Sequence, residues 1–173
     1  MFGHTATVEK APWARANADA LVLCALFNSF PFDWLVRQKA ATHLSLYILD
    51  ALPMPRLSDG ARHFLAHAAL RLSCNHSGYT ELWHEQTGGK TIPESTEEIR
   101  PRIDAIVAHA YGLNREQYDH ILRSFSHRSH PDAPTLCLAA FDELKARGPS
   151  KFYRQHDPLA DVPLVTARGE PSP

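Results

Sequence analysis

Between Ala18 and Ser29 the chain reads Ala18-Asp19-Ala20-Leu21-Val22-Leu23-Cys24-Ala25-Leu26-Phe27-Asn28-Ser29, and this segment is apolar over nearly its whole length. Asn17, which comes just before it, is a residue type that often caps the N-terminus of a helix. A helix that is hydrophobic on every side is stable only when several neighbours cover it. The segment therefore predicts a buried helix around which other helices pack.

Further helices are predicted on the C-terminal side of this segment. Pro31 suits the first turn of a helix that runs through Lys39, and Asp33 and Arg37 lie four residues apart in it. Capping and periodicity signals mark four more helices. These run over 60–72 after a cap at Asp59, from the Ser95–Glu98 capping box to near Gly112, from the Asn114–Gln117 pair through Phe125, and from Pro134 to about Arg147.

Two segments give weaker signals. Every second residue from Leu44 to Ile48 is aliphatic, which is typical of a short strand. One helical turn that leads into Leu52-Pro53-Met54-Pro55 is the alternative, and the pattern leaves both open. Residues 73–93 contain three glycines and many polar residues, so we expect a loop-rich connection there.

Together these patterns predict a mainly α fold, namely a compact helical domain of about five or six helices with at most a short β element. A chain of 173 residues is long enough to bury one core. We expect a ragged N-terminus over 1–15, a helical domain over 16–148 and an extended or disordered tail over 149–173. The tail is expected because four prolines lie between 158 and 173.

Charge and cysteine usage limit the class of protein. The chain has 18 basic and 19 acidic residues, which argues against binding of nucleic acid through a strong positive field. Thirteen of the basic residues are arginine, which suits contacts with phosphate and guanine. The composition therefore permits DNA binding without predicting it. Cys24, Cys74 and Cys137 form no CxxC pair, so we expect buried thiols in a reducing compartment.

No part of the sequence predicts a membrane segment. A helix needs about 20 apolar residues to cross a bilayer, and no run approaches that length. The richest stretch, Leu21–Phe27, is short and begins too far into the chain for a secretion signal. We therefore expect a cytoplasmic protein with no membrane partner.

Catalytic motifs are missing from the sequence. There is no glycine-rich phosphate loop, and no asparagine precedes a proline as the adenine-N6 methyltransferase tetrapeptide requires. Pro131-Asp132 with Glu143 and Lys145 superficially resembles a metal-dependent nuclease pattern. A helix between the two carboxylates would hold them about 15 Å apart, too far to share a metal ion. We therefore expect no catalytic residue and no cofactor.

Two histidine pairs have spacings that can chelate a metal. His63 and His67 lie four residues apart, and His127 and His130 lie three apart. Neither pair has the adjacent glutamate of an HExxH motif or an obvious third ligand, so we expect no metal site. A polar helix face made of His63, His67 and Arg71 is the simpler interpretation, and such a face can also turn toward phosphate. A metal-dependent enzyme that uses these histidines is the weaker alternative.

An ordered set of segments resembles a known family. The first block is Leu26-Phe27-Asn28-Ser29-Phe30-Pro31-Phe32-Asp33-Trp34-Leu35-Val36-Arg37-Gln38-Lys39, followed by Thr42-His43-Leu44-Ser45-Leu46-Tyr47-Ile48-Leu49 and Leu52-Pro53-Met54-Pro55. The later pieces are 103–113, 118–122, 137–144 and His156-Asp157-Pro158. Over about residues 20–165 they resemble the C-terminal target-recognition region of type IIG restriction–modification enzymes and adenine-N6 DNA methyltransferases. The specificity subunits of type I systems are similar in a looser way.

The resemblance implies a role without catalysis. In such enzymes this region helps to shape the surface that reads bases, while another domain transfers the methyl group. Relatives often carry paired glycines where this chain has Ala40-Ala41, and the methylase domain would lie upstream of Met1. We therefore expect a DNA target-recognition module, or a C-terminal fragment of such an enzyme, with no activity alone. The alternative is a helical protein–protein interaction module that docks onto a separate methylase subunit.

The expected partners are double-stranded DNA and a catalytic methylase domain or subunit. Candidate DNA-facing groups lie in and after the second predicted helix, because they combine cationic and amide donors. They are Arg37, Gln38, Lys39, Thr42 and His43, with a secondary basic face of His63, His67 and Arg71. The alternative for Arg37 is an ion pair with Asp33. Trp34 and Tyr47 are expected in the core.

Overall fold

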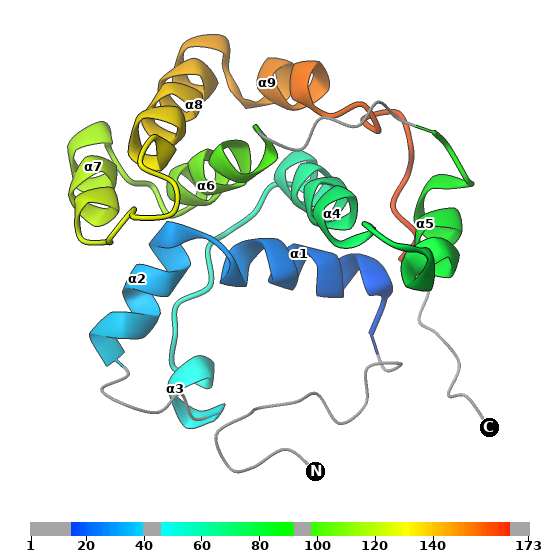
Figure 1. Cartoon of the computed structure of the whole chain (residues 1–173), viewed down its shortest axis with the longest axis horizontal. Coiled ribbons are helices and arrows are strands. Elements are labelled where there is room, and N and C mark those ends of the chain that lie inside the picture. The colour runs from blue at the N-terminus through cyan, green and yellow to red at the C-terminus, as the bar shows by residue number, and fades with distance from the viewer. Residues whose placement is uncertain (1–14, 40–45, 92–97, 167–173) are drawn as a thin grey trace.

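The computed structural model describes residues 15–39, 46–91 and 98–166, and within them the regular structure is helical with no strand (Figure 1). The predicted mainly α fold is therefore confirmed. The helices are α1 (Asn17–Phe27), α2 (Phe30–Lys39), α3 (Leu46–Asp50), α4 (Asp59–Ser73), α5 (Thr80–Thr87), α6 (Ile99–Ala110), α7 (Arg115–Arg123), α8 (Ala133–Arg147) and α9 (Pro149–His156), with a 3-10 turn η2 (Ser77–Tyr79) before α5.

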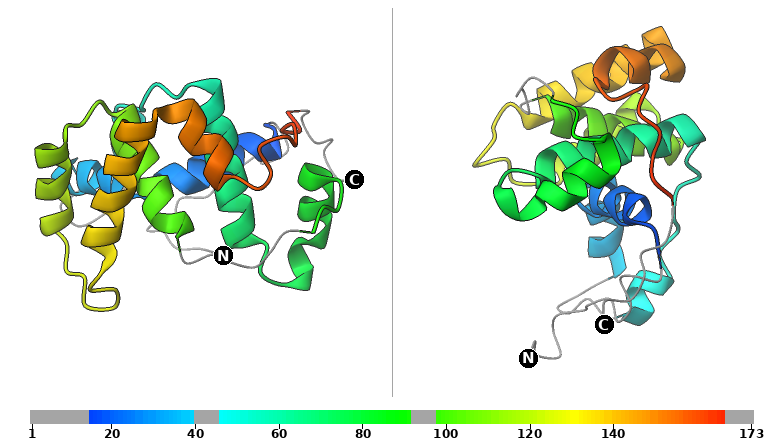
Figure 2. Two further views of the ribbon diagram at one scale, coloured as in Figure 1. Left: turned by 90° about the horizontal axis from the view of Figure 1, so that it is seen from above. Right: turned by 90° about the vertical axis from the view of Figure 1, so that its right-hand side faces the viewer.

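The helices α4 and α6 lie in the middle of the molecule, with α1 and α2 on one side and α8 and α9 on the other (Figures 1 and 2). The most extensive packing is that of α1 on α4 and of α6 on α8. Leu65, Leu70, Ile106, Leu144 and Phe152 are fully buried in the core that these helices share. Each such side chain contributes roughly 1.5–3 kcal/mol through removal from water.

A second cluster of buried side chains joins α6, α7 and α8. Tyr118 of α7 and Phe141 of α8 lie with their ring centroids 5.2 Å apart, and Cys137 is buried beside them. The two clusters meet along α6, because Ile106 and Val107 belong to the first while Ala105 and Ala108 belong to the second. Helix α6 therefore links both halves of the core.

The first helix is covered on one side only, which corrects the prediction of burial on every side. Ala18, Leu21, Val22, Ala25 and Leu26 are buried. On the open side Phe27 is 46% exposed and Cys24 is also exposed, so the expectation of three buried thiols is wrong at Cys24. Asn17 is the first helical residue and its side chain donates to Glu85 at 2.8 Å instead of capping the helix.

Helix α2 confirms the predicted helix through Lys39. Its N-terminus is held by a residue distant in sequence, since the backbone N–H of Phe30 donates to the Asp104 carboxylate at 2.6 Å. No single described helix is long and apolar enough to cross a membrane. Helices α1 and α2 satisfy that test only when taken together, and they are bent by 73° at the break between them.

The two segments with weaker signals both contain helix. Residues 46–50 form the helical turn α3, while Leu44 and Ser45 lie outside the described residues. The expected loop over 73–93 instead contains η2 and α5, so the loop-rich prediction is wrong for 77–87. Gly88 supports the end of α5 because its φ of 63° falls in the left-handed region that glycine adopts without strain.

The capping predictions have mixed outcomes. Asn114 and Gln117 form the predicted capping box at α7. Helix α4 is capped by Ser58, whose Oγ accepts from the N–H of Ala61, so the prediction of Asp59 was wrong by one position. The predicted partner of Glu98, Ser95, lies outside the described residues, and Glu98 makes no side-chain cap.

The tail begins later than predicted. Residues 149–156 form α9, and of the described residues only 157–166 follow the last helix. Phe152 and Leu159 are both fully buried in the core, and Val162 and Leu164 pack against it. The domain boundary at 148 is therefore a correction, because 149–166 complete the core.

Candidate functional site

The sequence-predicted DNA-facing residues lie at the C-terminal end of α2. Arg37, Gln38 and Lys39 are all exposed, whereas Thr42 and His43 lie outside the described residues. Arg37 makes a two-bond ion pair with Asp33, at 3.1 and 3.0 Å, which raises the pKa of the guanidinium. The alternative for Arg37, an ion pair with Asp33, is therefore present, and the paired guanidinium stays at the surface.

A second segment, which carries further basic residues, contacts α2. The guanidinium carbon of Arg37 lies 4.8 Å from the centroid of the Phe125 ring, and Phe30 contacts the rings of both Phe125 and His127. The start of the loop after α7, at Phe125 and His127, therefore contacts α2. We define the basic surface as the exposed side chains of Arg37, Gln38, Lys39, Arg123, Arg128 and His130.

The charge of this surface is positive. Asp33 pairs with Arg37 and Asp119 pairs with Arg123, each within one helix. Within the described part of the chain, Lys39 and Arg128 have no carboxylate partner. Sequence reasoning missed the loop, although the run from Arg123 to His130 contains two arginines and two histidines that signal it.

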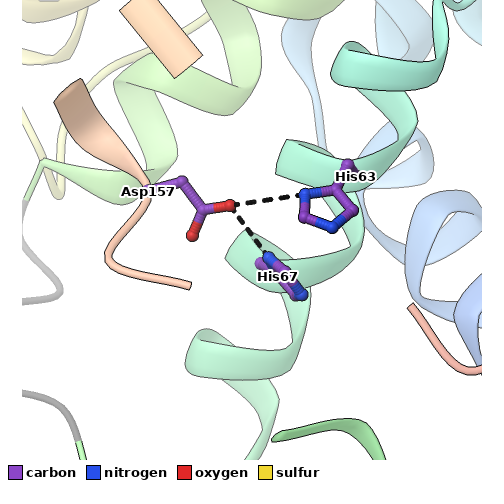
Figure 3. A group of neighbouring side chains, drawn as sticks. All are labelled: His63, His67 and Asp157. Carbon is purple, nitrogen blue, oxygen red and sulfur yellow. Dashed lines mark hydrogen bonds and ion pairs between the residues drawn. The ribbon is translucent and has the colours of Figure 1, made fainter. Parts of the chain in front are cut away.

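The secondary basic face has a different structure from the one predicted. His67 is 1% exposed and His63 is half-buried, so these residues do not form a solvent-facing polar stripe on α4. Both rings instead meet Asp157, which follows α9 (Figure 3). The Nδ1 atom of His67 lies 2.8 Å from Asp157 Oδ2, and Nδ1 of His63 lies 3.9 Å from the same oxygen.

The environment of this group combines burial with charge. Burial lowers the pKa of His63, as does His67, against the raising effects of the Val162 carbonyl and Asp157. Burial also lowers the pKa of Arg71, against the raising effect of Asp157. The ring of His67 contacts that of His63 at a centroid distance of 4.4 Å. His63, His67, Asp157 and Arg71 therefore form a small polar cluster at the edge of the apolar core.

Asp157 is the residue that sequence reasoning missed. It lies 90 positions from His67, so no local spacing could connect the two. Histidine, cysteine, aspartate and glutamate are the side chains that usually bind metal ions. In the described residues, one group of three of them, His63, His67 and Asp157, has ligand atoms that all lie within 4.8 Å of one another. The third ligand that the sequence lacked is therefore present in space, and these residues could hold a metal ion.

The other candidate sites do not assemble. His127 bonds through Nε2 to the Leu122 carbonyl at 2.7 Å and packs on Phe30, which is a structural role. Asp132 precedes α8, while Glu143 lies within that helix and pairs with His156 and Arg147. The carboxylates of the nuclease-like pattern thus lie along one helix instead of on adjacent strands.

One buried carboxyl group lies between α2 and α6. Burial raises the pKa of Asp104 to about 7, against the lowering effects of the Phe30 N–H and Arg100. Burial likewise raises the pKa of the Cys137 thiol to about 12 and that of Tyr118 above its ordinary range, and Asp104 adds to both shifts. A thiol reacts as the thiolate, so this cluster is built for packing and not for nucleophilic chemistry.

Comparison with known proteins finds no matching family model, no matching curated protein and no matching solved structure.

Proposed function

We propose that the chain is a non-catalytic DNA target-recognition module, either self-standing or the C-terminal part of an adenine-specific DNA methyltransferase or restriction–modification enzyme. The observation that carries the proposal is the basic surface, in which Arg37 lies over Phe125 of the segment that also contains Arg128 and His130. The ordered resemblance over about residues 20–165 supports the same conclusion.

The chemistry of this surface suits a nucleic acid. Exposed lysine and arginine side chains neutralise phosphates, and an amide such as that of Gln38 can bond to adenine. The Phe125 ring and the Asp33 carboxylate hold the Arg37 guanidinium in one orientation, which lowers the entropy lost on binding. The net charge of −1 fits a module that helps a larger enzyme to position bases and does not bind DNA strongly alone.

A salt series tests the proposal. Fluorescence anisotropy of a labelled DNA duplex, titrated with the protein at increasing salt, gives the affinity at each concentration. Two to four phosphate contacts predict a slope of log affinity against log salt of about −2 to −4. No binding at low salt would contradict DNA binding by the isolated chain.

Charge-reversal variants locate the contact. Lys39→Glu and Arg128→Glu each remove one exposed cation of the basic surface, so we expect weaker binding and a salt slope smaller by about 1 for each. Lys151→Glu and Arg154→Glu are the matched controls, because both residues are exposed on α9, across the core from α2. Equal losses from both pairs would show that net charge, and not this surface, governs binding.

A second candidate function is docking onto a separate methylase subunit, and the apolar side of α1 favours it. A groove of about 270 Å³ lies between α1 and the segment after α3. Its apolar lining comes from Val22, Leu23, Leu26, Met54, Pro55 and Leu57. Phe27 and Met54 are 46% and 48% exposed, and Tyr47, expected in the core, is 83% exposed.

Co-purification with the methylase subunit tests this second function. We expect Met54→Glu to abolish the association, because a charge in an apolar interface lacks a partner. Leu136→Glu is the control, since Leu136 is 47% exposed on α8 and lies outside the groove. A monomer that does not associate with the methylase would rule this function out.

A further inference from the structure

The His63–His67–Asp157 cluster has a geometry that neither proposed function uses. The two histidines lie one turn apart on α4, and Asp157 comes from the segment after α9 (Figure 3). The two Nδ1–Oδ2 distances are 2.8 and 3.9 Å. Ligands around a tetrahedral ion with bonds of about 2.1 Å are separated by about 3.4 Å, a value between these two distances. The three ligand atoms all lie within 4.8 Å of one another, so movements of about 1 Å per side chain would bring them to the spacing of ligands that share an ion.

The carboxylate is held in place before any ion binds. Its Oδ1 accepts from the backbone N–H of Leu159 at 2.9 Å, which leaves Oδ2 for the histidines. The Asp157 N–H donates to the Tyr153 carbonyl, and its own carbonyl accepts from Ala160. Coordination at such a site loses little conformational entropy, because backbone bonds fix the ligand.

Hydrogen bonding within the protein does not satisfy the buried imidazole. Within the described residues, Nε2 of His67 has no hydrogen-bond partner, although the ring is 1% exposed. The other ring nitrogen, Nδ1, is the one that faces Asp157 Oδ2. Two imidazoles and one carboxylate are also the donor set that zinc and related ions prefer.

We propose that His63, His67 and Asp157 bind a divalent transition-metal ion such as Zn²⁺, which fastens the segment 157–166 to α4. His63 is the ligand nearest to solvent, with 27% of its side chain exposed, so a water molecule can fill the fourth position from that side. Arg71 lies near Asp157 and balances the carboxylate before the ion arrives. An ion at this position would join two segments that are distant in sequence.

Isothermal titration with Zn²⁺ alone tests the site, using untagged full-length protein first treated with a chelator and then dialysed. We expect one ion per chain and a higher melting temperature with Zn²⁺. Co²⁺ in place of Zn²⁺ should give visible absorption bands typical of nitrogen and oxygen ligands. The absence of binding at one ion per chain would overturn the proposal.

Two variants test individual ligands, and a third serves as the control. His63→Gln and Asp157→Asn should each weaken Zn²⁺ binding at least about tenfold and abolish the rise in melting temperature. The first changes a half-exposed side chain and the second keeps an oxygen for the Leu159 N–H, so both should fold; circular dichroism checks this. His120→Gln, at an exposed position on α7, should bind Zn²⁺ like the unaltered protein. Equal binding by His63→Gln and the unaltered chain would assign the ion to surface histidines and overturn the proposal.

Discussion

At the scale of single residues, Asp104 shows how one buried carboxyl group can organise two helices. It lies on α6, is 4% exposed, and accepts the first N–H of α2. A helix N-terminus carries partial positive charge, which favours a carboxylate there. Burial outweighs this effect and raises the pKa to about 7, so the protonated form is favoured in the folded state.

Asp104 makes stability depend on pH. Its pKa is raised from 3.8 to about 7, so the folded state binds this proton more tightly than the unfolded chain does. The resulting contribution to the free energy of unfolding is fully present below about pH 4 and is lost as the pH rises to 7. Asp104→Asn keeps an oxygen for the Phe30 N–H but cannot ionise. Relative to the unaltered protein, its free energy of unfolding should rise by on the order of 2 kcal/mol between pH 5 and pH 8.

Urea denaturation at the two pH values measures this difference. Asp161→Asn is the control, because Asp161 is exposed and should give no such change. If Asp104→Asn and the unaltered protein differed in free energy of unfolding by the same amount at both pH values, the raised pKa of Asp104 would be contradicted.

At the scale of elements, some helices begin at a cap formed by residues next to them in sequence, while others begin at a cap supplied by a distant residue. The Asn114–Gln117 pair is a complete local signal, and α7 begins there. Helix α2 instead depends on Asp104, which lies 74 residues away. The order of helices was therefore largely predictable, whereas the device that holds α2 was not.

Helix α7 should depend on its capping box. Asn114→Ala removes the oxygen that accepts the Gln117 N–H at 2.8 Å, so we expect a loss of about 1 kcal/mol in the free energy of unfolding. Asn114→Asp retains an acceptor and should stay close to the unaltered stability. Chemical denaturation of both variants checks this, and equal losses would mean that the cap oxygen is not the cause.

At the scale of the whole molecule, the segment after Gly148 completes the fold. The prolines there indicated an extended or disordered tail, whereas 149–156 form α9, 158–161 form turns and much of the segment is packed on the core. Leu159 is fully buried even though Pro158 precedes it. Local composition can predict that a segment is not helical. Whether a side chain in that segment is buried depends on its contact with an apolar surface formed by other parts of the chain.

Truncation after Gly148 should therefore be severe. It removes Phe152 and Leu159, which are fully buried, and exposes the core beneath them. Loss of one large buried side chain costs about 3–5 kcal/mol, so we expect the truncated chain to lose most of its cooperative unfolding transition. Truncation after Thr166 is the control, since it keeps all of these contacts. Thermal unfolding compares the two, and an unchanged transition after Gly148 would contradict the packing of α9.

The helical class and the exposed Arg37–Lys39 group were predictable because they depend on neighbours within a few residues, and so were α1, α2, α4, α6, α7 and α8. Periodicity and caps act over one or two helical turns, and that range suffices for them. Three contacts join residues that lie 74 to 90 positions apart in sequence. They are the contact of Arg37 with Phe125, the bond from the Phe30 N–H to Asp104, and the contact of His67 with Asp157. Only packing of the helices brings such groups together, because a one-dimensional pattern contains no information on which helix faces meet.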